Sequence, residues 1–397
     1  MNGALAGLRV LDLTQGPAAL CGRLLGDLGA DVVKIEPPAG DEARRWPPFA
    51  GDRLDPEGSL AFLAYNSNKR GITLDLDGLT GRAHLRRLAA TADVLVESCP
   101  PQRGAALGLR FEALQEVNPR LVCAAITGFG LDGPYAGFLA PELVAFALGG
   151  LLYQSGAASE PPTVAPGHQS WGLAAINAAV TILAAVRARA TTGSGQQVEA
   201  NAMECMVYEG SSVSRYSQDG HIIGREGSRH GSAAPGDIYP TRDGFVHLYV
   251  SPRPGQWSAF RDWIDHPILR DEVWADAIFR RTNIDAIDPV VGEWTVPQEK
   301  EAVMAEGQRR HIPVEPVYTP CEFLENDQTR ARGYLLQADH ARVGRHGLPG
   351  APYRLSAAPW ALRRPAPLLG QHNAEVYGEE LGLSTAQMTL LRAHRVI

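Results

Sequence analysis

Short apolar runs alternate with amphipathic stretches along the first third of the chain. An apolar run at residues 8–13 is followed by a Gly-Pro break, a helical pattern over 18–28 and a second apolar run at 31–36. Apolar positions at 3.6-residue spacing are typical of an amphipathic helix, and short apolar runs bounded by turn residues are typical of buried strands. The segment is therefore predicted to form a strand–helix–strand unit.

The same alternation occurs twice more before residue 130. Residues 79–92 have a helical pattern that leads into an apolar run at 93–97, and residues 110–118 lead into another run at 121–126. Repeated alternation of this kind predicts an α/β fold with a doubly wound parallel sheet covered by helices on both faces. The longest helix is expected at residues 173–190, before a glycine-containing stop.

The pattern changes in the second half of the chain. Two apolar runs, 238–241 and 245–250, flank the pair Asp243-Gly244, which is typical of tight hairpins. Antiparallel strands after a parallel half predict a second, smaller α+β domain over about residues 225–325. The proline-rich stretch 349–367 is expected to be extended rather than packed as a helix or strand.

Composition excludes several classes of function. A net charge of −7 gives no overall basic surface for nucleic acid. The most apolar stretch, residues 173–186, is shorter than the ~20 residues of a membrane span, and the first nine residues lack a secretory-signal pattern. The five cysteines are scattered without a Cys-x-x-Cys pair, which argues against a zinc site or a disulfide framework and for a reducing compartment. We expect a cytoplasmic protein that binds no nucleic acid, membrane or metal.

Eight segments follow one another in order along nearly the whole chain, namely residues 7–13, 25–37, 66–76, 92–97, 128–135, 192–196, 327–333 and 366–372. Together they resemble one family, the family III CoA-transferases, which also include relatives of the carnitine-CoA enzymes and of α-methylacyl-CoA racemase. The resemblance implies a Rossmann-like large domain built from both chain ends, residues 1–210 and 330–397, with the small domain between them. It also implies an interlocked dimer, in which two chains thread through each other. The substrate would be coenzyme A as an acyl-CoA, with no covalently bound cofactor.

The resemblance assigns CoA contacts to loops at the sheet edge. Lys69 and Arg70 are interpreted as a loop pair that donates charge-assisted hydrogen bonds to the CoA phosphates; the alternative is a solvated basic loop. Gln15 and Gly16 follow the first strand, at the carboxyl edge where open α/β sheets bind ligands; the alternative is a plain turn. No Gly-x-Gly-x-x-Gly follows that strand, which disfavours a nicotinamide cofactor.

Other CoA-facing positions depart from the family pattern. Ser98 stands where asparagine is usual, and Ala106 where an arginine is common. Arg103, one turn away, is a candidate substitute for that arginine. Arg44 resembles the family loop after the second strand, with an exposed ion pair as the alternative. These departures argue against tight CoA binding in the usual pose.

His168 occupies the position at which the resemblance implies an aspartate nucleophile. In the family mechanism that carboxylate attacks an acyl-CoA thioester and then carries CoA as an aspartyl thioester. An imidazole cannot form the aspartyl-CoA stage, so His168 suits general acid–base work instead. The alternative is a loop histidine bound to backbone. The racemase histidine is also missing, because Pro141 stands at its place.

Glu142 matches a glutamate of the transferase branch. It is a candidate for orienting an intermediate, binding water or capping a helix start.

Three hypotheses follow. In the first, the chain is a subunit of a CoA-transferase that pairs with an aspartate-bearing paralogue and moves CoA between an acyl-CoA and a carboxylic acid. In the second, it is an independent lyase, isomerase or epimerase acting on an acyl-CoA or related thioester, with His168 as base. In the third, it is a non-catalytic binding protein on the same scaffold. The first is preferred, and both a homodimer and a heterodimer with the paralogue remain open.

Overall fold

The structure, a computed structural model, describes residues 3–208, 210, 212–229 and 231–397. Residues 1, 2 and 209, within the ranges predicted for the large domain, and residue 230, within the predicted small domain, lie outside the described residues, as does residue 211. The chain divides into two compact units. The large unit comprises residues 3–151, 165–220 and 328–397, and the small unit comprises residues 152–164 and 221–327.

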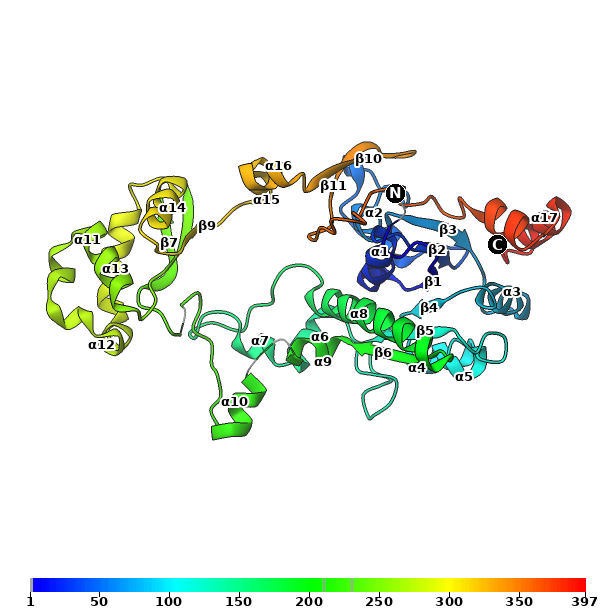
Figure 1. The fold of residues 1–397 in the computed structure, drawn as a ribbon, viewed down its shortest axis with the longest axis horizontal. Coiled ribbons are helices and arrows are strands. Elements are labelled where there is room, and N and C mark those ends of the chain that lie inside the picture. Colours follow the sequence, from blue (N-terminus) through cyan, green and yellow to red (C-terminus); the bar gives the residue numbers. More distant parts are fainter. Residues whose placement is uncertain (1–2, 209, 211, 230) are drawn as a thin grey trace. The chain divides into compact units, whose positions relative to one another are not determined.

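A six-stranded parallel sheet forms the centre of the large unit (Figure 1). Its strands are β1 (Arg9–Leu13), β2 (Asp31–Glu36), β3 (Lys69–Thr73), β4 (Val94–Glu97), β5 (Val122–Thr127) and β6 (Gln196–Asn201). Their order is β3-β2-β1-β4-β5-β6, so the direction of winding reverses between β1 and β4. This is the doubly wound order of a Rossmann-like sheet, and it confirms the predicted fold class.

Helices cover both faces of this sheet. Those of the large unit are α1 (Leu20–Asp27), α2 (Leu60–Asn66), α3 (Leu79–Ala89), α4 (Pro101–Ala106), α5 (Phe111–Leu114), α6 (Glu142–Leu148), α8 (Gln169–Thr192), α9 (Ala202–Tyr208), α10 (Ser212–Asp219), α16 (Asp327–Arg332), the π-helix η6 (Ala374–Glu380) and α17 (Thr385–Ala393). One apolar cluster joins α1 and α8 to one face, and a second joins α3, η6 and α17 to the other. The C-terminal helices therefore complete a layer over strands from the other end of the chain.

Helix α8 runs beside β5 and β6 (Figure 1). Its small residues Ala174, Ala175, Ala178 and Ala179 are buried against the sheet. Among the described residues, α8 is the one helix long and apolar enough to cross a membrane by length and composition. Its alanine face is packed against the sheet in the core of the large unit.

The small unit contains a three-stranded antiparallel sheet, as predicted. Its strands are β7 (Gly236–Thr241), β8 (Gly244–Tyr249) and β9 (Val314–Pro316), in the order β7-β8-β9. The hairpin turns at Arg242-Asp243, with Thr241 opposite Gly244. Its helices are α11 (Pro254–Ile264), α12 (Ala277–Thr282), α13 (Ile284–Thr295), α14 (Lys300–Arg309) and α15 (Pro320–Glu325), with α7 (Leu151–Gln154) at the start of the unit. An apolar core of its own, which includes Trp257 and Phe260, holds the unit together.

Some elements differ from the sequence predictions. The helix expected at 110–118 is only the short α5, and the hairpin of β10 (Leu335–His340) and β11 (Gly344–Pro349) was not predicted. Residues 152–164 belong to the small unit, although the predicted large domain includes them. Short 3₁₀ turns connect several elements, namely η1 (Gly16–Ala19), η2 (Glu42–Arg45), η3 (Ala50–Asp52), η4 (Pro267–Arg270) and η5 (Glu272–Ala275).

Candidate active site at the carboxyl edge of the sheet

Gln15 and Ser98 meet at the point where the winding of the sheet reverses. Strands β1 and β4 are neighbours, with Leu13 opposite Glu97, so the residues that follow both strands leave the sheet side by side. The backbone amide of Gln15 donates to Ser98 Oγ over 2.8 Å. A carboxyl edge at such a switch point is where open α/β sheets bind ligands. The structure therefore brings together two of the predicted CoA-contact residues.

Gly16, Trp46 and His168 form a layered group at the same edge. Gly16 has a φ of +53°, and a Cβ there would lie 2.7 Å from Trp46 Cη2. The Trp46 ring therefore lies directly on the Gly16 backbone, which only glycine permits. The same indole stacks on the His168 imidazole, with ring centroids 5.5 Å apart and planes at 30°.

His168 is the N-cap residue of α8, and its side chain makes no capping hydrogen bond. Its imidazole is exposed, and among the described residues it contacts the Trp46 ring without a hydrogen-bond partner. The N-terminus of a 24-residue helix carries a partial positive charge that favours an anion. A carboxylate at position 168 would therefore suit this place better electrostatically than an imidazole does.

Glu142 supports the start of the His168 helix. Its Oε1 accepts from the Ser170 amide over 2.9 Å and its Oε2 accepts from Ser170 Oγ over 2.7 Å. Glu142 thus satisfies a free amide at the α8 N-terminus from outside that helix. Both of its oxygens are engaged. Burial, and then the charge of Glu142, raises the pKa of Tyr65, which places this tyrosine within electrostatic reach of the site.

The contact between Trp46 and His168 was not predicted. Trp46 follows η2, in the loop after β2, whereas His168 lies beyond the fifth strand. No local spacing joins the two, and the only sequence signal is that both follow the carboxyl ends of parallel strands. Trp46 was not among the site residues predicted from the sequence.

Lys69 and Arg70 are not in a loop, which corrects their predicted placement. They open strand β3 and are buried. Lys69 Nζ donates to Asp12 Oδ2 over 2.7 Å, to the Ala19 carbonyl over 2.7 Å and to Asn66 Oδ1 over 2.9 Å, which uses all its N–H groups.

Arg70 lies at the amino edge of the sheet, away from the switch point. Its guanidinium binds Asp31 over 2.6 Å, Glu375 over 2.8 Å and Glu380 over 2.5 Å. Burial alone would lower the pKa of Arg70, but Glu380 and Asp31 raise it above its ordinary value. A guanidinium shared by three carboxylates has its charge neutralised within the chain, so it has little left to attract a phosphate.

Arg44 is also internal rather than an exposed loop residue. It makes a bidentate pair with Glu36, at 2.6 Å and 2.8 Å, binds Glu57 over 2.7 Å and lies 3.7 Å from the Phe62 ring centroid. Its contacts hold the loop after β2 to the sheet. Arg103, by contrast, is exposed in a 2.5 Å pair with Asp77, and it is the predicted cation that stays accessible.

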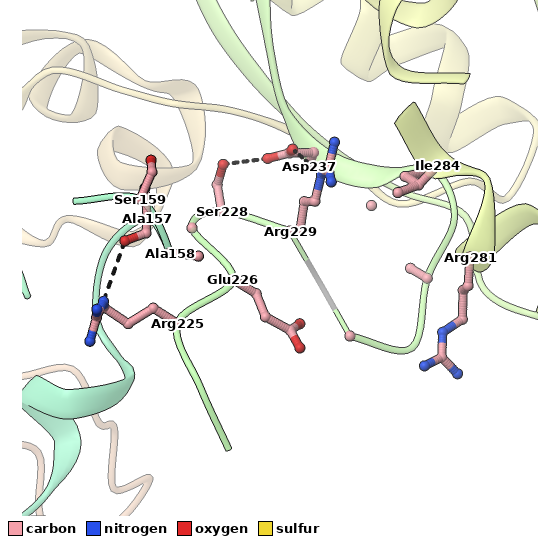
Figure 2. Close-up of a pocket in the computed structure, with 14 residues that line it drawn as sticks. Ala157, Ala158, Ser159, Arg225, Glu226, Ser228, Arg229, Asp237, Arg281 and Ile284 are labelled. Carbon is pink, nitrogen blue, oxygen red and sulfur yellow. Dashed lines mark hydrogen bonds and ion pairs between the residues drawn. The ribbon is translucent and has the colours of Figure 1, made fainter. Parts of the chain in front are cut away.

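The small unit contains a separate cavity of about 710 Å³ (Figure 2). Within it, Arg229 is held by Asp285 over 2.6 Å and Asp288 over 2.7 Å. Arg225, at the left in Figure 2, donates to the carbonyl oxygen of Ala157 over 3.3 Å. Both arginines are thus engaged by neighbouring residues of the small unit. None of the predicted site residues is among the described residues that line it.

No group of three or more His, Cys, Asp or Glu in the described part of the chain is arranged to hold a metal ion. The five cysteines are free. Burial raises the pKa of the Cys99 thiol, the cysteine closest in sequence to the switch point, to about 12. It is therefore protonated and unreactive at neutral pH.

Comparison with known proteins agrees with this fold. The family profile of CoA-transferase family III matches residues 5–373. Formyl-CoA:oxalate CoA-transferase of Streptomyces avermitilis is 34% identical, with the whole of both chains covered. Subunit BbsE of succinyl-CoA:(R)-benzylsuccinate CoA-transferase from Thauera aromatica is 32% identical over 94% of this chain and 93% of its own.

Solved structures show the same architecture. A CAIB/BAIF family protein from Brucella suis superposes with a TM-score of 0.86 at 28% identity, covering 96% of this chain and 100% of that one. The profile match and the curated relatives extend over both units, so they apply to the whole molecule rather than to a shared Rossmann-like half. The chain belongs to CoA-transferase family III.

Proposed function

We propose that this chain is a subunit of a CoA-transferase that moves CoA between an acyl-CoA and a carboxylic acid, and that an aspartate-bearing paralogue supplies the nucleophile. One observation carries the proposal. The carboxyl edge, the glycine turn and the helix N-terminus form an ordered site, yet the residue at its centre is His168 rather than a carboxylate.

Glu142 does not replace the missing carboxylate. Both of its oxygens accept hydrogen bonds from Ser170, which fix the carboxylate against the start of α8. Covalent transfer of CoA requires instead a carboxylate that is positioned to attack the thioester carbonyl. A relative with this domain organisation is a named subunit of its enzyme, subunit BbsE. This supports an assembly in which the nucleophile comes from a second chain.

We place CoA at the switch point, against Gln15, Gly16 and Ser98, with the exposed Arg103 as the cation at its rim. We assign Lys69, Arg70 and Arg44 a structural role instead of a direct contact with CoA. Their donors are already bound to groups within the chain. We propose that the protein is located in the cytoplasm, where it would meet acyl-CoA.

The subunit proposal is tested by isolating the tagged chain from the cells that make it naturally. We expect a homologous second chain to copurify, to carry an aspartate at the position aligned with His168, and to be required for CoA transfer. Intact mass spectrometry identifies the chains, and the transfer assay follows. Isolation of a fully active homo-oligomer would contradict the proposal.

An independent enzyme with His168 as base is the second candidate. The observation in its favour is that the imidazole is exposed and free of hydrogen bonds among the described residues, so its nitrogens are available to a substrate. Turnover of an acyl-CoA without CoA transfer, lost in His168→Ala, would establish this function instead. If instead the chain purifies as a homodimer with no affinity for CoA, a non-catalytic binding protein on this scaffold would be favoured.

We also propose that α8 contributes to a dimer interface, with the same chain or with the paralogue. Its alanine face is buried in the sheet, yet its opposite face exposes Ile176 by 45% and Val180 by 62%. The neighbouring α6 exposes Leu143 and Leu148. A helix that is apolar all round is typical of one buried on both sides, which supports a partner chain on this surface.

Val180→Glu is expected to weaken the dimer by at least about 10²-fold, because an uncompensated charge buried in an interface costs roughly 3–5 kcal/mol. Light scattering after gel filtration measures the change over a dilution series. Leu390→Glu, at an apolar exposed position on α17, is the matched control and should leave the dimer intact. A Val180→Glu protein as dimeric as the control would exclude this interface.

A further inference from the structure

A buried chain of charged groups lies beneath the carboxyl edge of β1 and β2. Lys34 Nζ pairs with Asp41 Oδ2 over 2.7 Å, and Lys69 Nζ pairs with Asp12 Oδ2 over 2.7 Å. All four side chains are fully buried. Bringing such ions out of water costs several kcal/mol each, so a buried pair is poor support for a purely stabilising role. The contacts of these buried pairs therefore indicate a role other than stabilisation.

The Lys34–Asp41 pair joins three segments of the site. Lys34 Nζ also donates to the carbonyl oxygen of Thr14, the residue before Gln15. Asp41 Oδ1 accepts from the Gly16 amide over 3.3 Å and from the Ala43 amide over 2.8 Å. One carboxylate thus binds the turn after β1 and the first residues of η2 at the same time.

These two segments hold the layers of the active site. The η2 turn leads directly into Trp46, whose amide donates to the Ala43 carbonyl over 3.2 Å. The Trp46 ring lies on Gly16 and stacks on His168. Loss of the Asp41 carboxylate would let the Gly16 turn and the turn before Trp46 shift relative to each other, because this carboxylate accepts from both of them.

We infer that the ion pair Lys34–Asp41 positions the active site by fixing the Trp46 ring against Gly16, and so sets the surface on which residue 168 and the bound thioester lie. The contact of the ring with Gly16 and His168 stands on geometry alone; its consequence for the thioester rests on the proposed function. Asp41 touches no reacting atom and is a positioning residue.

The charge state of Asp41 agrees with this role. Burial alone would raise its pKa, but the Lys34 charge and the hydrogen bonds from Lys34, Ala43 and Gly16 bring the pKa below its ordinary value. The carboxylate is therefore ionised at neutral pH and accepts from Lys34 and from both turns. The adjacent pair of Glu36 and Arg44 faces the same segment, and Glu36 Oε2 accepts from the Asp41 amide over 2.9 Å.

The test follows Trp46 by ¹⁹F NMR of protein labelled with 5-fluorotryptophan. The chain has seven tryptophans, so Trp46→Phe assigns the Trp46 resonance by its loss. His168→Asn then shows how far that resonance moves when the stacked imidazole is removed. Asp41→Asn, which keeps an oxygen acceptor and removes the charge, is expected to move or broaden the Trp46 resonance by a comparable amount.

Two further variants keep the test decisive. Asp93→Asn removes the carboxylate of a partly exposed pair, Arg189–Asp93 at 2.8 Å, at the opposite edge of the sheet, and should leave the Trp46 resonance in place. If Asp41→Asn does not fold, the double variant Lys34→Met/Asp41→Asn leaves no buried charge unpaired and should show the same displacement. A folded Asp41 variant with the wild-type Trp46 resonance would overturn the inference.

The NMR result does not depend on the reaction. In the active assembly we additionally expect Asp41→Asn to lower kcat/KM for CoA transfer by about 10–10²-fold, as a misplacement near 1 Å does in other sites. If Asp41→Asn moves the Trp46 resonance but leaves kcat/KM unchanged, Asp41 does position Trp46, and the proposed location of the thioester is wrong. If it lowers kcat/KM without moving the Trp46 resonance, Asp41 does not position Trp46.

Discussion

Replacing His168 by aspartate is expected to give the isolated chain CoA-transferase activity, at least about 10²-fold above the wild-type homo-oligomer, the size of effect that correct placement of a reacting group has. Position 168 is the N-cap of the 24-residue α8. Aspartate is among the preferred N-cap residues and its charge is favoured there. The change therefore restores a carboxylate where the local structure accepts one.

The expected chemistry leaves a trace that mass spectrometry detects. The carboxylate introduced by His168→Asp attacks the thioester carbonyl, a mixed anhydride forms and the CoA thiolate leaves. The thiolate then attacks the aspartyl carbonyl, which releases the free acid and leaves CoA bound as an aspartyl thioester. Intact mass should show this CoA adduct with His168→Asp and none with His168→Asn, an N-cap of the same shape without a nucleophile. CoA binding without an adduct in His168→Asp would show that more than the nucleophile has been lost.

Replacing Lys69 by methionine is expected to destabilise the large unit by about 3–5 kcal/mol. The substitution keeps an unbranched side chain but leaves Asp12 buried without its cation, and it removes the donors to Ala19 and Asn66. Urea unfolding measures the free energy of unfolding. The protein concentration is kept fixed, because association between chains also changes the apparent stability. A CoA-binding surface lysine would instead change affinity and leave stability nearly unaltered.

Two comparisons make the Lys69 result interpretable. The double variant Lys69→Met/Asp12→Leu should recover much of the loss, because apolar residues replace a buried pair at little cost. Arg103→Met, which removes the exposed pair with Asp77, should change stability by less than about 1 kcal/mol. Equal losses for Lys69→Met and Arg103→Met would contradict the internal role assigned to Lys69.

The sheet could be predicted from the sequence because its strands and helices alternate in a local pattern. Strands β1, β2, β4 and β5 coincide with apolar runs. Strand β3 was missed because Lys69 and Arg70 break its apolar run, and their polarity suggested a loop. Their partners, Asp12 for one and Asp31 for the other, lie far away in the sequence. Polar side chains in a buried strand can be assigned only once those partners are known.

The site was predictable in part for the same reason. Gln15, Gly16 and Ser98 follow the carboxyl ends of β1 and β4, which the general rule for open sheets places together. The stacking of Trp46 on His168 depends on where two loops fold back, which no periodicity encodes. Arg44 and Glu142 were also predicted as site residues, but their hydrogen bonds support other segments of the chain instead of reaching outward.

The proposed subunit role is tested most directly by an exchange measurement on the wild-type chain purified alone. The chain is incubated with an acyl-CoA and an isotopically labelled carboxylic acid, and label in the acyl-CoA pool and covalent adducts on the protein are followed by mass spectrometry. We predict neither exchange nor adduct until an aspartate-bearing partner chain is added. Exchange catalysed by the chain alone, and abolished by His168→Ala, would contradict the account.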